Sequence, residues 1–102
     1  MKNLIFGKTI EQGNEFLDNL IGEFKYKEVQ EYRKNREGNI AILTNSDIYK
    51  VVASNSSLRG QRCHRAYIQN GINQEIIDEI ILPRIIAFES PLKENETIVY
   101  WD

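Results

Sequence analysis

Few residues of this chain could build a disulfide, a metal cluster or a membrane span. Its 102 residues include one cysteine, Cys63, and one histidine, His64. A single cysteine excludes an internal disulfide, and a lone Cys/His pair excludes a zinc cluster of the usual kind. No apolar run approaches the roughly 18 residues that a membrane-spanning helix needs. The apolar run near the start is also too short for a secretory signal, so we expect a cytoplasmic protein. We expect neither a metal nor a cofactor.

The length and composition indicate one globular domain that spans residues 1–102. A chain of 102 residues can build one hydrophobic core but not two. Apolar residues make up 41% and charged residues 27%, which is ordinary for a folded protein and argues against disorder.

The charge is unevenly distributed along the chain. The net charge is −2, yet residues 48–74 contain no acidic residue and hold four of the 13 Lys and Arg residues together with His64. All 15 acidic residues therefore lie elsewhere. This asymmetry predicts a locally positive surface on an acidic protein.

Apolar periodicity predicts two helices. Thr9, followed three residues later by Gln12, fits the start of a helix over 9–24. Asn73 can cap a second helix, whose apolar face carries Ile76, Ile77, Ile80, Ile81 and Ile85, and Pro83 should end or kink it.

Short apolar runs between turn residues predict the strands: 4–6, 40–43, 48–53, 66–68 and 97–101, with 26–36 as an exposed edge strand. The runs 40–43 and 48–53 should form a hairpin. Residues 54–62 and 91–96 are predicted to be loops. The expected fold is α/β, a single small domain with a mixed β-sheet covered by two helices.

The segment Gly7-Lys8-Thr9 is the first candidate site. A glycine turn between a strand and a helix directs backbone N–H groups and the positive end of the helix dipole at one point, which suits an anion. Lys8 would add a charge and Thr9 a hydroxyl. The alternative is a glycine turn with a threonine helix cap and no ligand.

The second candidate is the basic loop that starts at Ser54 and ends at Arg65. The planar guanidinium group of arginine binds oxyanions through paired hydrogen bonds, glycine lets a ligand approach the backbone closely, and serine hydroxyls donate further hydrogen bonds. The residues expected to bind an anion here are Ser56, Ser57, Arg59, Gly60, Arg62 and Arg65. The alternative is a solvated loop whose arginines pair with the acids Glu75, Asp78 and Glu79.

Three further side chains have structural interpretations. Cys63 is expected to be a partly buried thiol, since free cysteines are commonly buried. His64 is expected to be structural, because the sequence shows no pattern typical of a catalytic triad. Tyr100 and Trp101 lie in the last strand, where exposed aromatic residues would mark a homodimer or partner contact. The alternative is that Trp101 folds back on the core of its own domain.

The order of motifs over 47–85 resembles part of the ATPase domain of phage large terminases, which are helicase-like packaging motors. In that family a strand pair precedes a Ser-rich loop with an Arg-Gly step, then a strand ending in Asp-Glu, and then a helix. Here these features correspond to 48–53, 54–62, 66–70 and the helix from Asn73. Gly7-Lys8-Thr9 looks like a remnant of the family's phosphate loop.

Two departures from this family bear on function. Gln69 and Asn70 stand where the acidic pair would hold Mg²⁺, and amides are poor ligands for that ion. Lys2 stands where the phosphate loop would have its first glycine. The resemblance therefore implies a scaffold that has lost hydrolysis and kept an anion-binding loop.

The favoured hypothesis is a non-enzymatic binding module of phage or mobile-element type, whose partner is a nucleotide, a nucleic acid or an acidic protein surface. A second is a phage-encoded inhibitor of a host defence system, which binds a host protein or sequesters a nucleotide in the host cytoplasm. A third, a nucleotide-hydrolysing enzyme, is disfavoured by Gln69 and Asn70.

Overall fold

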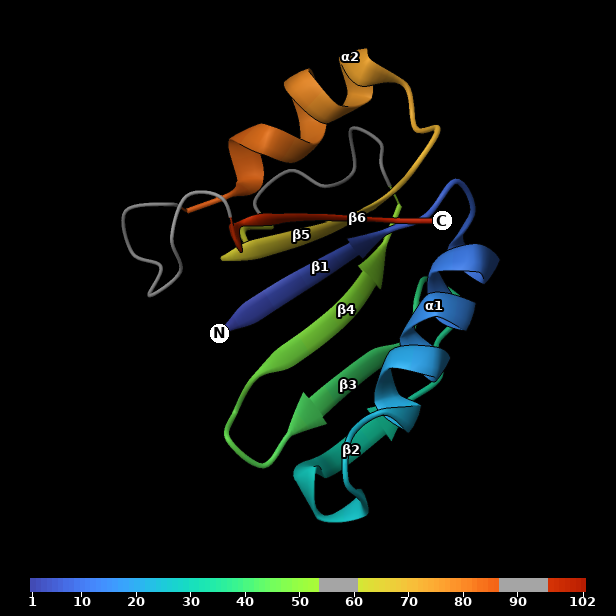
Figure 1. The fold of residues 1–102 in the computed structure, drawn as a ribbon, viewed down its shortest axis with the longest axis vertical. Helices are drawn as coiled ribbons and strands as arrows, with labels where there is room; N and C mark the ends of the chain where they lie inside the picture. Colours follow the sequence, from blue (N-terminus) through green and yellow to red (C-terminus); the bar gives the residue numbers. More distant parts are fainter. Residues whose placement is uncertain (54–60, 87–95) are drawn as a thin grey trace.

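A six-stranded mixed sheet forms the centre of the molecule (Figure 1). The computed structural model describes residues 1–53, 61–86 and 96–102. The strands are β1 (Lys2–Phe6), β2 (Val29–Arg33), β3 (Ile40–Leu43), β4 (Ile48–Val52), β5 (Arg65–Gln69) and β6 (Ile98–Trp101). The helical segments are α1 (Ile10–Gly22), a turn η1 (Tyr26–Glu28), and α2 (Gln74–Ile76) continued by η3 (Ile77–Ile81) and η4 (Leu82–Arg84). The predicted α/β fold is confirmed.

The strand order is β2-β3-β4-β1-β5-β6. β1 pairs in parallel with both β4 and β5, and β6 pairs in parallel with β5, whereas β2, β3 and β4 form an antiparallel meander. The four parallel strands therefore all begin at one edge of the sheet and all end at the other. We call these the amino edge and the carboxyl edge.

Alternating side chains give the sheet two apolar faces, and each face packs against its own helix. Leu4, Phe6 and Ile68 face the α2 segment, where Ile77 and Ile81 cover them. Ile5 and Val51 belong to the cluster on the other face, which Leu17 of α1 covers. Each apolar cluster is thus built from one helix and the alternate residues of several strands.

The start of α1 follows the sequence prediction closely. The Thr9 side chain accepts a hydrogen bond from the backbone N–H of Gln12 at 3.1 Å, which satisfies one of the helix's free donors. α1 ends at Gly22, two residues before the predicted end.

The second helix differs more from its prediction. The Asn73 side chain caps it through the N–H of Glu75 at 2.8 Å, as expected. The helix then widens into a π-turn and ends at Arg84, so Ile85 is extended and forms a bridge with Cys63 instead of continuing the helical face. Pro83 lies in this last tight turn, where its ring and missing N–H oppose a longer helix.

The remaining elements shift by a few residues. The predicted edge strand over 26–36 is a 3₁₀ turn followed by β2, and β5 is one residue longer at each end than the expected 66–68. The hairpin of β3 and β4 forms as predicted, with Ser46 at φ 75° in its turn. Most of the two predicted loops, residues 54–60 and 91–95, lies outside the described residues.

Candidate functional site

The structure separates the predicted anion-binding residues. Ser56, Ser57, Arg59 and Gly60 lie outside the described residues. Of the other four, Lys8 and Thr9 follow β1 at the carboxyl edge, while Arg62 and Arg65 lie at the amino edge, just before β5 and at its first residue. Because β1 and β5 are parallel, the length of a strand of five residues, about 15 Å, separates the two groups.

At the carboxyl edge, the chain itself already uses the donors expected for an anion. The backbone N–H of Lys8 donates to Oε1 of Gln69 at 2.7 Å, and the N–H of Gln12 is bound by Thr9. A Cβ placed on Gly71, whose φ is +94°, would lie only 2.6 Å from Cε of Lys8, so the lysine side chain packs against this glycine. Gln69 thus occupies the place that a ligand oxygen would take beside the turn.

Asn70 is also bound within the chain. Its N–H donates to the carbonyl oxygen of Trp101 at 2.6 Å, and its side-chain amide donates to the carboxylate of Asp102. These bonds tie the ends of β5 and β6 together. Within the described residues, no group of three or more His, Cys, Asp and Glu side chains is arranged to hold a metal ion.

A pocket of about 290 Å³ lies at the carboxyl edge between α1 and the ends of β5 and β6. Inside it, the rings of Phe16 and Trp101 stack with centroids 4.4 Å apart. Its lining consists of Gln12, Glu15, Phe16, Asn19, Gln69, Trp101 and Asp102. The sequence did not predict this pocket, because its residues come from three segments that are far apart in the chain. Only the four lining residues of α1 share a pattern in the sequence: their i, i+3, i+4 and i+7 spacing places them on one face of the helix.

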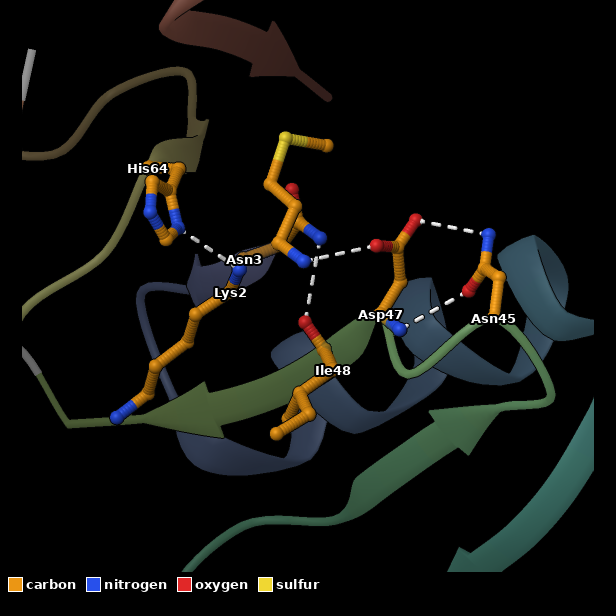
Figure 2. Close-up of polar contacts among 7 residues, drawn as sticks. Lys2, Asn3, Asn45, Asp47, Ile48 and His64 are labelled. Carbon is orange, nitrogen blue, oxygen red and sulfur yellow. Dashed lines mark hydrogen bonds and ion pairs between the residues drawn. The ribbon is translucent and has the colours of Figure 1, made fainter. Parts of the chain in front are cut away.

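At the amino edge, polar contacts hold the starts of three strands together (Figure 2). The N–H of Lys2 donates to Nδ1 of His64 at 3.0 Å, and the amino group of Met1 forms an ion pair of 2.9 Å with Asp47. The Asn3 side chain donates to the carbonyl oxygen of Ile48 at 3.2 Å. His64 is thus a structural residue, as predicted, which accepts a hydrogen bond from the backbone. The negative charge of Asp47 is balanced by the amino group of Met1.

Cationic side chains gather at the same edge. The residues are Lys2, Arg62, Arg65 and Arg84. Arg84 lies beside the start of β5, because its carbonyl oxygen accepts a hydrogen bond from the N–H of Cys63 at 2.8 Å. Among the described residues none of the four forms an ion pair, so the alternative pairing with Glu75, Asp78 or Glu79 is not seen for Arg62 or Arg65.

The partners of these cations are neutral. Nε of Arg65 donates to the carbonyl oxygen of Glu96 at 3.0 Å, and its Nη1 donates to the Tyr67 hydroxyl at 3.3 Å. Arg62 is exposed. In Figure 2 the Lys2 side chain points away from Asp47. In the described part of the chain, none of the four cations therefore has a carboxylate within ion-pair distance.

Buried polar atoms without partners also concentrate here. Across the described residues four such side-chain atoms occur, and three belong to segments at the amino edge: Asn3 Oδ1, Gln61 Oε1 and Arg84 Nε. The fourth is Nε1 of Trp101 in the carboxyl-edge pocket. Native proteins pair nearly all their buried polar groups, so these exceptions single out the two edges.

The ionisable groups of the core are held neutral. Burial raises the pKa of the Cys63 thiol to about 11, so the thiolate is scarce at neutral pH and the residue is a poor nucleophile. Burial, followed by the neighbouring Tyr67, raises the pKa of Tyr49 to about 12. The prediction of a structural Cys63 is confirmed, and its side chain is fully rather than partly buried.

The last strand contains one packed and one exposed aromatic residue. Trp101 stacks on Phe16 of its own domain, which is the alternative that the sequence left open. Tyr100 is 53% exposed on the edge strand β6. A homodimer through this strand stays a prediction, and Tyr100 rather than Trp101 is the residue that would contact the second copy.

No family model, curated protein or solved structure matches the chain. None of the helices formed by the described residues has the length and apolar character needed to cross a membrane. The functional argument therefore depends on the geometry of the two edges.

Proposed function

We propose that this protein is a non-enzymatic binding module that holds an anionic partner at the amino edge of its sheet. The observation that supports this most strongly is the group of four cations, Lys2, Arg62, Arg65 and Arg84, which have no carboxylate partner among the described residues. Uncompensated cations that lie together create a local positive potential even on a protein of net charge −2.

Burial strengthens this positive potential. Nε of Arg84 is shielded from water and has no acceptor among the described residues, and leaving a buried donor unpaired costs about 1–3 kcal/mol. Since the Arg84 side chain as a whole is only half-buried, a carboxylate of a partner could bind its other N–H groups through charge-assisted hydrogen bonds. The carboxyl edge offers no such advantage to an anion, because Gln69 already satisfies the N–H of Lys8.

Among anionic partners, an acidic protein surface fits this edge best. Arginine is enriched in protein interfaces, whereas proteins that bind single-stranded nucleic acid stack bases on aromatic side chains. Tyr67, the aromatic residue that touches Arg65, is only 8% exposed and cannot offer its ring to a base.

The proposal is tested by measuring binding to fluorescein-labelled poly-L-glutamate, with a short DNA duplex as the second probe. Arg62→Ala should weaken polyglutamate binding by about 1–3 kcal/mol, the usual range for a charge-assisted hydrogen bond, and Arg62→Lys should weaken it less. Stability should change little, since Arg62 is exposed. Lys27→Ala, which removes an exposed charge from η1, is the matched control.

Two results would contradict the proposal. Equal affinity of wild type and Arg62→Ala for polyglutamate would remove the amino edge as the binding surface. Tighter binding to the DNA duplex, with affinity that falls steeply as salt rises, would replace a protein partner by a nucleic acid.

A further inference from the structure

The pocket at the carboxyl edge lies where α/β sheets commonly bind ligands. The chain leaves β1 into α1 on one face of the sheet, and it leaves the adjacent strand β5 into α2 on the other face (Figure 1). Such a reversal opens a crevice outside the carboxyl ends of the two strands. Gln69, the last residue of β5, lines the pocket found there.

A polar group in the lining of the pocket presents a free donor. Gln69 is 8% exposed, and its Oε1 is fixed by the N–H of Lys8 at 2.7 Å. That bond orients the amide. Its Nε2 has no acceptor among the described residues and, because it is not one of the buried unpaired atoms, it is accessible from the pocket. A pre-oriented, unpaired amide donor in a pocket favours a ligand with a carbonyl oxygen.

Other residues of the lining accept hydrogen bonds. One carboxylate oxygen of Asp102 is bound by Asn70, and its second oxygen has no partner in the described part of the chain. Glu15 supplies a second carboxylate without an ion pair there. These acceptors favour N–H donors on the ligand, and they disfavour a phosphate or carboxylate by repulsion.

The aromatic lining favours a flat ring. Phe16 and Trp101 stack at 20° to each other, and both residues line the pocket. The volume of about 290 Å³ is at the low end of small-molecule sites, which suits one heterocycle with a sugar rather than a larger cofactor.

We propose that this pocket binds a nucleobase that carries a carbonyl oxygen next to N–H donors, as guanine does. The carbonyl oxygen would accept from Nε2 of Gln69, and the adjacent N–H groups would donate to the carboxylate of Asp102. An organic cation would leave the Gln69 donor unpaired. Adenine could turn ring nitrogen N1 to Nε2 and its 6-amino group to Asp102, but it would then give the carboxylate one donor group where guanine gives two.

The test is a titration with guanosine, an uncharged nucleoside that excludes any contribution of phosphate to binding. Trp101 is the only tryptophan and lines the pocket, so its fluorescence reports binding directly. Guanosine should produce a saturable change. Inosine, which lacks the 2-amino donor, and adenosine, which offers a single donor group beside its ring acceptor, should each bind several-fold more weakly.

Asp102→Asn should weaken guanosine binding about tenfold, which corresponds to about 1.4 kcal/mol. Glu11→Gln is the matched control, because Glu11 is exposed on the same helix and does not line the pocket. Arg62→Ala should leave guanosine binding unchanged, so this inference and the proposed function can fail separately.

Three outcomes would overturn the inference. They are the absence of a saturable fluorescence change with guanosine, equal affinity for adenosine, and an Asp102→Asn variant that binds guanosine as the wild type does.

Discussion

The hydrogen bond between Gln69 and Lys8 can be removed almost without changing volume. Gln69→Met keeps an unbranched side chain of similar size but deletes the acceptor for the N–H of Lys8, which now lies 2.7 Å from Oε1. Gln69→Glu retains an acceptor at the same place. The pair of variants therefore separates the hydrogen bond from the packing of this side chain.

The expected loss of stability follows from the surroundings of the two groups. A donor left unpaired costs about 1–3 kcal/mol, and full burial gives the upper value. Gln69 is buried but Lys8 is exposed, so water can partly replace the lost acceptor. We expect about 1–2 kcal/mol for Gln69→Met, which lowers the Tm of a domain of this size by about 4–16 °C.

Thermal unfolding followed by circular dichroism measures this difference. Gln30→Met, an exposed position on the edge strand β2, controls for the exchange of glutamine for methionine. Gln69→Glu should lose less stability than Gln69→Met at neutral pH. A Gln69→Met protein that melts with the wild type would refute the claim that Gln69 fills the anion position at this turn.

Other predictions concern strain, ionisation and catalysis. Gly38→Ala should lower the free energy of unfolding, measured in urea, by at least about 1–3 kcal/mol, because φ is +132° and a Cβ would lie 2.0 Å from the carbonyl oxygen of Val51. Gly22→Ala is the control: this position has open space around it, so the substitution should not lower the free energy of unfolding. Burial raises the pKa of the Cys63 thiol from 9.0 to about 11. As the pH rises, the thiol therefore loses its proton in the unfolded chain before it does so in the folded one. The free energy of unfolding should be constant below pH 9 in this respect and should fall between pH 9 and pH 11. That fall should be smaller in Cys63→Ala, and urea unfolding across this range checks it. No Mg²⁺-dependent hydrolysis of ATP or GTP above background is expected, and turnover that disappears on mutating Lys8 would contradict this.

Local features of the fold were predictable from the sequence. The caps Thr9 and Asn73 act between residues two or three apart in the chain, and the turn around Ser46 joins two adjacent strands. Such features depend on short-range sterics and hydrogen bonding, which a sequence displays directly. The end of the second helix was harder to predict, because Ile85 continues the apolar spacing but pairs with Cys63 instead.

The arrangement of the candidate sites was not predictable in the same way. Periodicity assigns a residue to a face of its strand, but it does not say which strands are neighbours. The parallel pairing of β1 with β5 places Lys8 and Arg65, which belong to two different candidate sites, at opposite edges of the sheet. Arg84 joins the amino edge only through the contact of its carbonyl oxygen with Cys63, a pairing that the sequence does not reveal.

The most direct test of the central claim is to map where an acidic partner contacts the protein. Backbone amide NMR shifts, recorded while poly-L-glutamate is added to the full chain, report each edge separately. We predict that the shifts concentrate at Lys2, residues 61–65 and residues 84–86, and that Arg62→Ala reduces them. Shifts that instead concentrate at Lys8, Thr9 and the first turn of α1 would contradict the account.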